Sequence, residues 1–301
     1  MTTTTHEKTT QSAIHDKGSA PRGPRRGGPP AARVAIWIGL IAAVFFALFP
    51  VYWMVLTSIT PRDEVFQFPP RFFPTSVTLE HYQSFFQTPQ LLVYLGNSVL
   101  VSVATAVGTV AVASLAAYSL SKFEYRGAKS VTVLIWTSQM FPNALLLITI
   151  YLMFDTMGML DTYWALILSF MTFTLPLCTF VLKGYFDTIP DEMLEAARID
   201  GANERTLIIR ILLPVAIPGM IAAGLFAFIR GWNDFIYALT LVGPDKRTLP
   251  PGLVTEFMGE FQAEWPALMA ASLITSAPIV VTFVILQRYF IEGLTVGSVK
   301  G

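Results

Sequence analysis

The sequence has little of what soluble enzymes and metalloproteins are built from. Only 13% of its 301 residues are charged and 53% are hydrophobic, with a mean hydropathy of +0.57, whereas soluble chains carry about 25% charged residues. The one cysteine, Cys178, excludes an intrachain disulfide, and two of the three histidines lie in the first 15 residues. Cysteine and histidine are the usual ligands of structural and catalytic zinc. We therefore expect neither a soluble enzyme nor a metal site.

Motifs for catalysis and nucleotide binding are missing too. The sequence contains no Walker sequence G-x-x-x-x-G-K-[ST], no G-x-S-x-G and no H-E-x-x-H, so it offers no ATP site of that kind and neither of these hydrolase motifs. Its 20 Lys and Arg residues balance 20 Asp and Glu residues, without the basic excess that favours nucleic-acid binding. We expect no catalytic residue, no cofactor and no nucleic-acid partner.

What the sequence does contain is long apolar runs. There are six, over about 34–59, 91–120, 131–154, 163–182, 212–242 and 266–286. About 20 apolar residues in a helix cross a hydrocarbon core of roughly 30 Å, whereas barrel strands alternate over about ten residues. The sequence predicts an all-α integral membrane domain of six transmembrane helices over 34–301, in contact with lipid. The polar residues 1–33 are predicted to form a disordered cytoplasmic tail.

Five of these runs contain a proline, at positions 50, 142, 176, 218 and 278. A proline inside a helix removes one backbone hydrogen bond and kinks the helix, and in a membrane it also occurs where water or a neighbouring helix satisfies the freed carbonyl. The sequence alone leaves both interpretations open, and we expect a bundle of bent helices.

The distribution of Lys and Arg residues predicts the orientation of the chain in the membrane. Fifteen of the 20 Lys and Arg residues fall in 1–33, 121–130, 183–211 and the tail after 286, which six helices place on one side of the membrane. Four lie on the opposite side, and Arg230 lies inside a run. Because cytoplasmic loops carry the excess of Lys and Arg, we expect both termini to be cytoplasmic.

The loop between the fourth and fifth runs predicts a short helix over 189–200. Thr188 is placed to cap its start, and Gly201 to end it in a left-handed conformation. A second short helix is expected over about 204–213, ending at Pro214.

The predicted 189–200 helix is amphipathic. Its apolar side carries Ile189, Met193, Leu194 and Ala197, and its polar side carries Asp191, Glu195 and Arg198. Ile199 lies nearer the polar side and is an exception to the pattern. The helix lacks the basic face and aromatic anchors of helices that lie on lipid headgroups. The pattern leaves two roles open, docking of a cytoplasmic partner or a structural brace.

Several segments together resemble one family. Glu195-Ala-Ala-Arg-Ile-Asp-Gly-Ala202 looks like the EAA loop of binding-protein-dependent ABC importer permeases. Other motifs resemble the smaller subunit of the maltose/trehalose-type permease pair, and the resemblance runs from about residue 35 to the C-terminus. They are Phe73-Pro74 with Thr78-Leu-Glu-His-Tyr82, Asn97-Ser98, Leu115-Ala-Ala-Tyr118, Ser121-Lys-Phe-Glu-Tyr-Arg-Gly127, Gly158 to Tyr163, Trp232-Asn-Asp234 and Gly293-Leu-Thr-Val-Gly-Ser-Val-Lys-Gly301.

The resemblance implies a role and a set of partners. A subunit of this kind is a non-catalytic part of an ATP-driven sugar importer in the inner or plasma membrane of a prokaryote. It pairs with a homologous second permease subunit, two ATPase subunits and an extracytoplasmic sugar-binding protein. The 189–200 helix is then the coupling helix, with ATPase-coupling residues Glu195, Ala196, Ala197, Asp200 and Gly201. The resemblance also implies that 293–301 reaches the ATPases and 243–265 the binding protein.

A polar cluster interrupts the fifth run. Charged residues within membrane helices usually pair or face water, and Arg230 and Asp234 are four apart and able to pair. The stretch 212–230 is already 19 residues long, enough to cross the membrane. The cluster, which includes Trp232 and Asn233, therefore either lines a cavity or anchors the outer interface. The resemblance favours a translocation path.

Two rivals follow from the same composition. An ion-coupled secondary transporter is expected to carry carboxylates near the middle of the membrane, where only Asp234 is available. An intramembrane hydrolase needs a nucleophile with a base or metal set, and no histidine lies in any apolar run. We therefore expect a permease subunit, with the secondary transporter as the alternative.

Overall fold

The computed structural model describes residues 30–259 and 263–296. Most of the predicted 1–33 tail and the end of the 293–301 segment lie outside the described residues. Within those two ranges the fold is all-helical, apart from a single antiparallel bridge between Met258 and Ala263. The prediction of an all-α chain is confirmed for this part.

The helices follow the chain order. They are α1 Pro30–Ile59, α2 Glu80–Gln87, α3 Pro89–Lys122, α4 Ala128–Ser138, α5 Asn143–Thr156, α6 Tyr163–Phe186, α7 Asp191–Ile199, α8 Glu204–Leu207, the π-helix η1 Ile208–Leu212, α9 Leu213–Val215, α10 Ile217–Asn233, α11 Ile236–Thr240, the 3-10 helix η2 Pro244–Lys246, α12 Leu249–Phe257 and α13 Trp265–Val296.

The chain divides into two compact units, residues 1–50 and 51–301. Of the first unit the structure describes the beginning of α1, in which every side chain from Val34 to Pro50 is exposed. An apolar helix with no packed face is stable only where lipid or another protein covers it.

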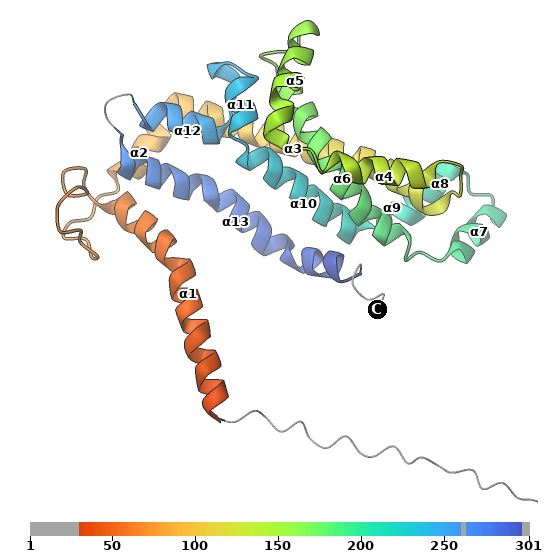
Figure 1. Cartoon of the computed structure of the whole chain (residues 1–301), viewed down its shortest axis with the longest axis horizontal. Helices are drawn as coiled ribbons and strands as arrows, with labels where there is room; N and C mark the ends of the chain where they lie inside the picture. Colours follow the sequence, from red (N-terminus) through yellow and green to blue (C-terminus); the bar gives the residue numbers. More distant parts are fainter. Residues whose placement is uncertain (1–29, 260–262, 297–301) are drawn as a thin grey trace, which may run out of the picture. The chain divides into compact units, whose positions relative to one another are not determined.

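In the second unit α3, α6 and α10 pack along one another, and α13 packs against α10 (Figure 1). Small residues allow close approach between these helices. A Cβ on Gly231 of α10 would stand 3.1 Å from the backbone of Ser102, and one on Gly219 would stand 2.4 Å from the Tyr185 ring. Ala113 and Ala117 of α3 are fully buried, as their spacing predicts.

Four helices within the described ranges are long and apolar enough to cross a membrane. They are Val34–Ile59, Pro89–Lys122, Tyr163–Phe186 and Trp265–Gln287. The predicted continuous runs 131–154 and 212–242 are wrong as single helices. The first is α4 followed by α5, bent by 101°. The second begins within the segment Glu204–Val215, continues through Ile217–Asn233, and is bent by 77° between the two. By length and composition each bent pair fits either one broken span or a re-entrant loop.

The prolines explain part of this difference. Pro50, Pro176 and Pro278 lie inside helices, whereas Pro142 precedes α5 and Pro218 lies in the first turn of α10. Proline is accommodated at a helix start because the first amides have no intrahelical acceptor. The predicted kinks at 142 and 218 are therefore breaks between helices.

Candidate docking helix and the polar cluster of α10

The predicted 189–200 helix is observed as α7, over Asp191–Ile199. Pro190 occupies its N-cap position with an extended backbone. The predicted Thr188 cap is wrong, because the Thr188 hydroxyl donates to the Tyr185 carbonyl at 2.7 Å and continues the turn that ends α6. Asp191 and Glu192 lie in the first turn, where carboxylates interact favourably with the helix dipole.

One face of α7 is buried against the ends of α3 and α6. Leu194 and the preceding Ile189 are 2% and 3% exposed, in a core cluster with Tyr118, Leu182 and Phe186. The apolar side that the sequence predicts is therefore the side on which α7 packs, although Met193 remains exposed.

Lys122, the last residue of α3, fixes the beginning of α7. Its side chain is 5% exposed, and its ammonium group binds the Ile189 carbonyl and the Asp191 carboxylate, each at 2.7 Å. Nearby, Asp187 accepts from Ser121 and pairs with Lys183, again at 2.7 Å. An ammonium group with two oxygen partners gives α7 a defined position on α3.

A second set of contacts fixes the end of α7. Gly201 has φ +86°, so the predicted left-handed stop is confirmed. Asn203 then caps α8 by accepting from the Thr206 amide at 2.9 Å. Arg198 pairs with Glu204 at 3.1 Å, and Glu204 also accepts a hydrogen bond from Tyr118 of α3. Both ends of α7 are therefore tied to α3.

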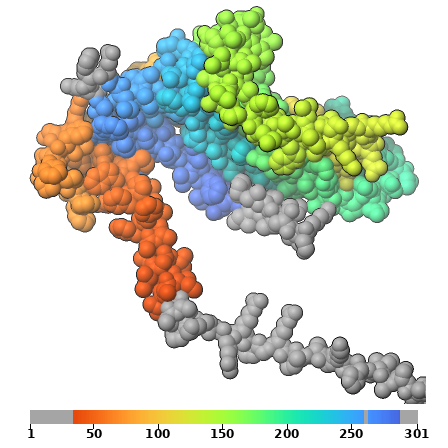
Figure 2. Space-filling model, in the orientation of Figure 1, coloured from red at the N-terminus to blue at the C-terminus, as the bar shows by residue number. Residues whose placement is uncertain are grey.

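The opposite face of α7 is exposed. Glu192, Glu195, Ala196 and Ile199 follow one another at helical spacing, and all four are accessible. Ile199 is 86% exposed, so the exception in the predicted pattern is an apolar residue on an open face. Asp200 and Gly201 are exposed beside it, and Ala197 is half-buried beneath. Figure 2 shows this part of the chain at the surface of the second unit.

The segment after α7 differs from its prediction. The helix expected over 204–213 continues through the π-helix η1 to Val215, so Pro214 does not end it. The break comes at Ala216, whose backbone leaves the helical region, and α10 begins at Ile217. The segment that carries α7 is thereby joined to α10 through a 77° bend.

The polar cluster of α10 is built around Asp234. Arg230 and Asp234 form the expected ion pair at 3.3 Å. The second oxygen of Asp234 accepts from the amides of Tyr237 and Ala238 at 2.9 and 3.2 Å, which caps α11. The Arg230 guanidinium also lies 5.5 Å from the centre of the Phe173 ring. Asp234 thus joins α10 to α11 in the interior.

Trp232 and Asn233 lie differently. Trp232 is buried, and its indole N–H donates to the Thr275 carbonyl of α13 at 3.2 Å. Asn233 is exposed. Both line a cavity of about 370 Å³ between α10, α12 and α13, whose wall includes Ser272 and Ser276. The four residues predicted from one motif are therefore divided between a structural ion pair and a partly polar cavity.

Sequence reasoning missed a set of contacts at the other end of α3. The Asn97 side chain donates to the carbonyls of Asp245 and Arg247, each at 2.9 Å. Asp161 accepts from the Gly243 amide at 2.9 Å and pairs with Lys246 at 3.1 Å, and these two contacts hold the pKa of the Asp161 carboxyl below its usual value. Asp161 has a positive φ of 55°, which is uncommon for a residue other than glycine, and this backbone conformation directs its side chain toward Gly243 and Lys246.

Several known proteins are similar to this chain along most of its length. The chain is 37% identical over 274 residues to the inner membrane ABC transporter permease protein YcjP of Escherichia coli, covering 90% of this chain and 97% of that protein. It is 33% identical to the trehalose/maltose transport system permease protein MalG of Thermococcus litoralis, covering 89% and 97%. It is also 33% identical to the diacetylchitobiose uptake system permease protein DasC of Streptomyces coelicolor, covering 88% and 97%.

A solved structure shares the fold. The crystal structure of a bacterial ABC transporter that imports alginate matches with a TM-score of 0.75 at 22% identity, covering 86% of this chain and 96% of the other. None of these similarities supports the ion-coupled alternative, and several apolar helices agree with a multi-pass membrane protein. A sequence profile of permeases matches residues 108–296. The chain belongs to the family described as the binding-protein-dependent transport system inner membrane component.

Proposed function

We propose that this chain is a permease subunit of an ATP-driven importer of a disaccharide or oligosaccharide. It forms the translocation path together with a homologous second permease subunit. Two ATPase subunits supply the energy, and an extracytoplasmic binding protein delivers the sugar. The named relatives that take up trehalose, maltose and diacetylchitobiose support this substrate class, and the family's dependence on a binding protein supports that partner.

In the membrane the chain has six spans with both termini in the cytoplasm. Four spans are single helices, and each of the two bent pairs supplies one broken span. This assignment makes 34–301 one permease domain behind a cytoplasmic tail, and it puts α7 on the cytoplasmic side with most of the Lys and Arg residues. The segment 243–265, outside the membrane, faces the binding protein.

The observation that carries the proposal is the two-sided character of α7. One face is buried on α3 and α6, and the other exposes Glu195, Ala196 and Ile199. A helix held at both ends moves as a rigid body with the bundle, whereas a free loop absorbs displacement without passing it on. A groove on one of the ATPase subunits takes up the exposed face of α7. Movement of that subunit then displaces α7 and, through the bend at Ala216, α10.

The experiment is a comparison of two carboxylate deletions in the assembled complex. Glu195→Ala removes a charge from the exposed face of α7, and Glu124→Ala removes an exposed charge from the loop between α3 and α4 as the matched control. We expect Glu195→Ala to abolish most binding-protein-stimulated ATP hydrolysis and sugar uptake while membrane insertion is unchanged, and the control to retain both. Unchanged uptake in Glu195→Ala would refute the docking role.

Within the translocation path, Asn233 is the member of the predicted cluster that faces the sugar. It is exposed and lines the cavity beside Ser272 and Ser276, and amide and hydroxyl groups hydrogen-bond to sugars. Arg230, Trp232 and Asp234 then hold its backbone in place. Asn233→Ala is expected to raise the KM for sugar uptake with little change in basal ATP hydrolysis. An unchanged KM would remove Asn233 from the path.

A further inference from the structure

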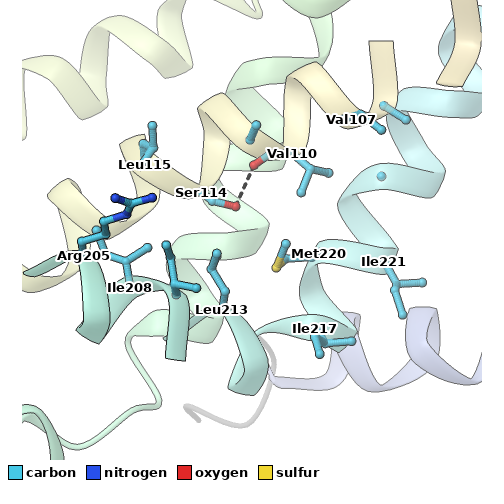
Figure 3. Close-up of a pocket in the computed structure, with 14 residues that line it drawn as sticks. Val107, Val110, Ser114, Leu115, Arg205, Ile208, Leu213, Ile217, Met220 and Ile221 are labelled. Atoms are coloured by element: carbon cyan, nitrogen blue, oxygen red, sulfur yellow. Dashed lines mark hydrogen bonds between the residues drawn. The ribbon is translucent and has the colours of Figure 1, made fainter. Parts of the chain in front are cut away.

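A large apolar groove runs along α3 and meets the segment that follows α7. Its volume is about 900 Å³. One wall is α3 from Ala106 to Leu115, and the other is formed by α8, η1, α9 and α10 (Figure 3). The bend at Ala216 turns the segment Glu204–Val215 away from the axis of α10. The second wall therefore consists of two helical parts that meet at an angle of 77°.

Charge within the groove is confined to one end. Arg205 is the charged member of the lining, and Figure 3 shows it beside Leu115 and Ile208, with Val107 and Ile221 toward the other end. The hydroxyl of Ser114, also in the wall, donates to the Val110 carbonyl at 2.6 Å and needs no further partner. The groove is therefore apolar along most of its length, with the positive charge of Arg205 at one end.

Arg205 has no anionic partner within the described ranges. The adjacent carboxylate, Glu204, is engaged by Arg198 and Tyr118. Among the described residues, none forms an ion pair or a side-chain hydrogen bond with Arg205. The Arg205 side chain is exposed and therefore accessible to a ligand. A guanidinium group has five donors that match phosphate oxygens.

The length of the groove fits one leaflet of a bilayer. Leu115 lies nine positions after Ala106 on α3, which is about 14 Å at 1.5 Å per residue. One leaflet contributes about half of a hydrocarbon core of roughly 30 Å. Arg205 lies at the end nearest α7, which is the cytoplasmic end in the proposed orientation. Basic pockets between helices on that side bind anionic headgroups.

We propose that this groove binds an anionic phospholipid of the cytoplasmic leaflet, with its phosphate on Arg205 and an acyl chain along α3. The occupant fills the space beside the bend between η1 and α10, and so stiffens the joint through which α7 is connected to the membrane domain. The proposal relies on the proposed membrane orientation, but its test measures lipid retention and does not depend on sugar transport.

The test is native mass spectrometry of the assembled complex, extracted from membranes and exchanged into nanodiscs of phosphatidylglycerol and phosphatidylcholine. We compare wild type with Arg205→Gln and with Arg210→Gln, an exposed arginine of η1 outside the groove lining, as the matched control. We expect retained phosphatidylglycerol in wild type and control, and a roughly fivefold weaker retention in Arg205→Gln, since one basic residue contributes about 1 kcal/mol to such binding.

A second variant probes the apolar part. Ala111→Trp places a large side chain in the groove from an exposed position on α3, and we expect it to displace the lipid while the complex still assembles. Wild type that retains no phosphatidylglycerol, or that retains phosphatidylcholine equally well, would overturn the proposal.

The rival occupant is a helix of the second permease subunit. Native Cys178 is buried, so a cysteine introduced as Ala111→Cys is the accessible thiol for cross-linking. Cross-linking of Ala111→Cys to the second permease subunit would overturn the lipid assignment. Labelling by a membrane-soluble maleimide without such a cross-link supports it.

Discussion

The hydroxyl of Tyr118 donates a hydrogen bond to the carboxylate of Glu204. The last turn of α3 is thereby joined to the first residue of α8, 86 positions later in the chain. Glu204 also holds Arg198 at the end of α7. One carboxylate therefore connects α3, α7 and the segment that returns to α10.

Tyr118→Phe removes this connection without changing the packing of the ring. A hydrogen bond to a charged group contributes about 1.5 to 3 kcal/mol, and we expect about 1 kcal/mol here because the Glu204 side chain is 53% exposed. The measurement is the free energy of unfolding of the purified complex in detergent. Tyr125→Phe, at an exposed loop tyrosine, is the control, and equal stability of the two variants would contradict the role of the contact.

The contacts of Lys122 lead to a separate prediction, about the coupling of ATP hydrolysis to sugar uptake. Lys122→Met keeps most of the side-chain volume but loses the bonds to the Ile189 carbonyl and to Asp191. We expect the ATPase subunits still to bind, because the exposed face of α7 is intact, but sugar uptake per ATP hydrolysed to fall several-fold. Lys129→Met, on α4, is the control. Loss of ATPase binding in Lys122→Met would show that the bond acts on docking and not on force transmission.

Close packing of α10 predicts opposite effects for two glycines of the same helix. A Cβ at Gly219 would lie 2.4 Å from the buried Tyr185 ring, whereas one at Gly224 would lie 3.4 Å from Val110. Overpacking costs about 1 to 3 kcal/mol, and Gly→Ala within a helix gains up to about 1 kcal/mol. In thermal unfolding, Gly219→Ala should therefore lower Tm, and Gly224→Ala should leave it unchanged or raise it. A stable Gly219→Ala would contradict the observed contact.

The stability of the loop after α11 should depend on pH through the ionisation of Asp161. Its pKa is lowered by the Gly243 amide and by Lys246. A carboxyl whose folded pKa lies below the ordinary value of 3.8 stabilises the fold above that value, and this contribution is lost as the pH falls through the folded pKa. Hydrogen exchange of Gly243, corrected for its intrinsic rate, should therefore be faster at pH about 3 than at pH about 6.

Asp161→Asn provides the control for this pH dependence. The amide cannot ionise, so the exchange of Gly243 should be fast at both pH values and the difference should disappear. Glu64, in the segment after α1, accepts hydrogen bonds from Thr75 and Ser76. Glu64→Gln therefore leaves the Asp161 contacts in place and should keep the difference. The same pH dependence in Asp161→Asn would assign it to another group.

Most of the helices could be predicted from the sequence because a chain in lipid must satisfy its backbone hydrogen bonds internally, which a helix does. Apolar runs of sufficient length become helices, and the left-handed stop at Gly201 follows from glycine's freedom at positive φ. Hydropathy does not register an interruption within an apolar run, so the kinks expected at Pro142 and Pro218 were not recognised as breaks between separate helices. Pro142 and Pro218 were the available signals, but a proline inside a helix and one at a helix start look alike in composition.

The site was predicted less completely than the fold. Spacing identified the amphipathic α7 and the Arg230–Asp234 pair, since both depend on residues close in sequence. The bonds from Lys122 to Ile189, from Tyr118 to Glu204 and from Asn97 to the loop after α11 join residues 67 to 150 positions apart. Such contacts depend on how α3 packs on α6 and α10, which no local pattern specifies.

The most direct test of the account is cross-linking at Ile199, the most exposed apolar residue of α7. Ile199→Cys in the assembled complex should cross-link to an ATPase subunit, with a yield that changes when ATP is added, and Met258→Cys, exposed beyond α12, should not. If Ile199→Cys instead reacts in intact cells with a membrane-impermeant thiol reagent, α7 faces outward and the coupling role is refuted.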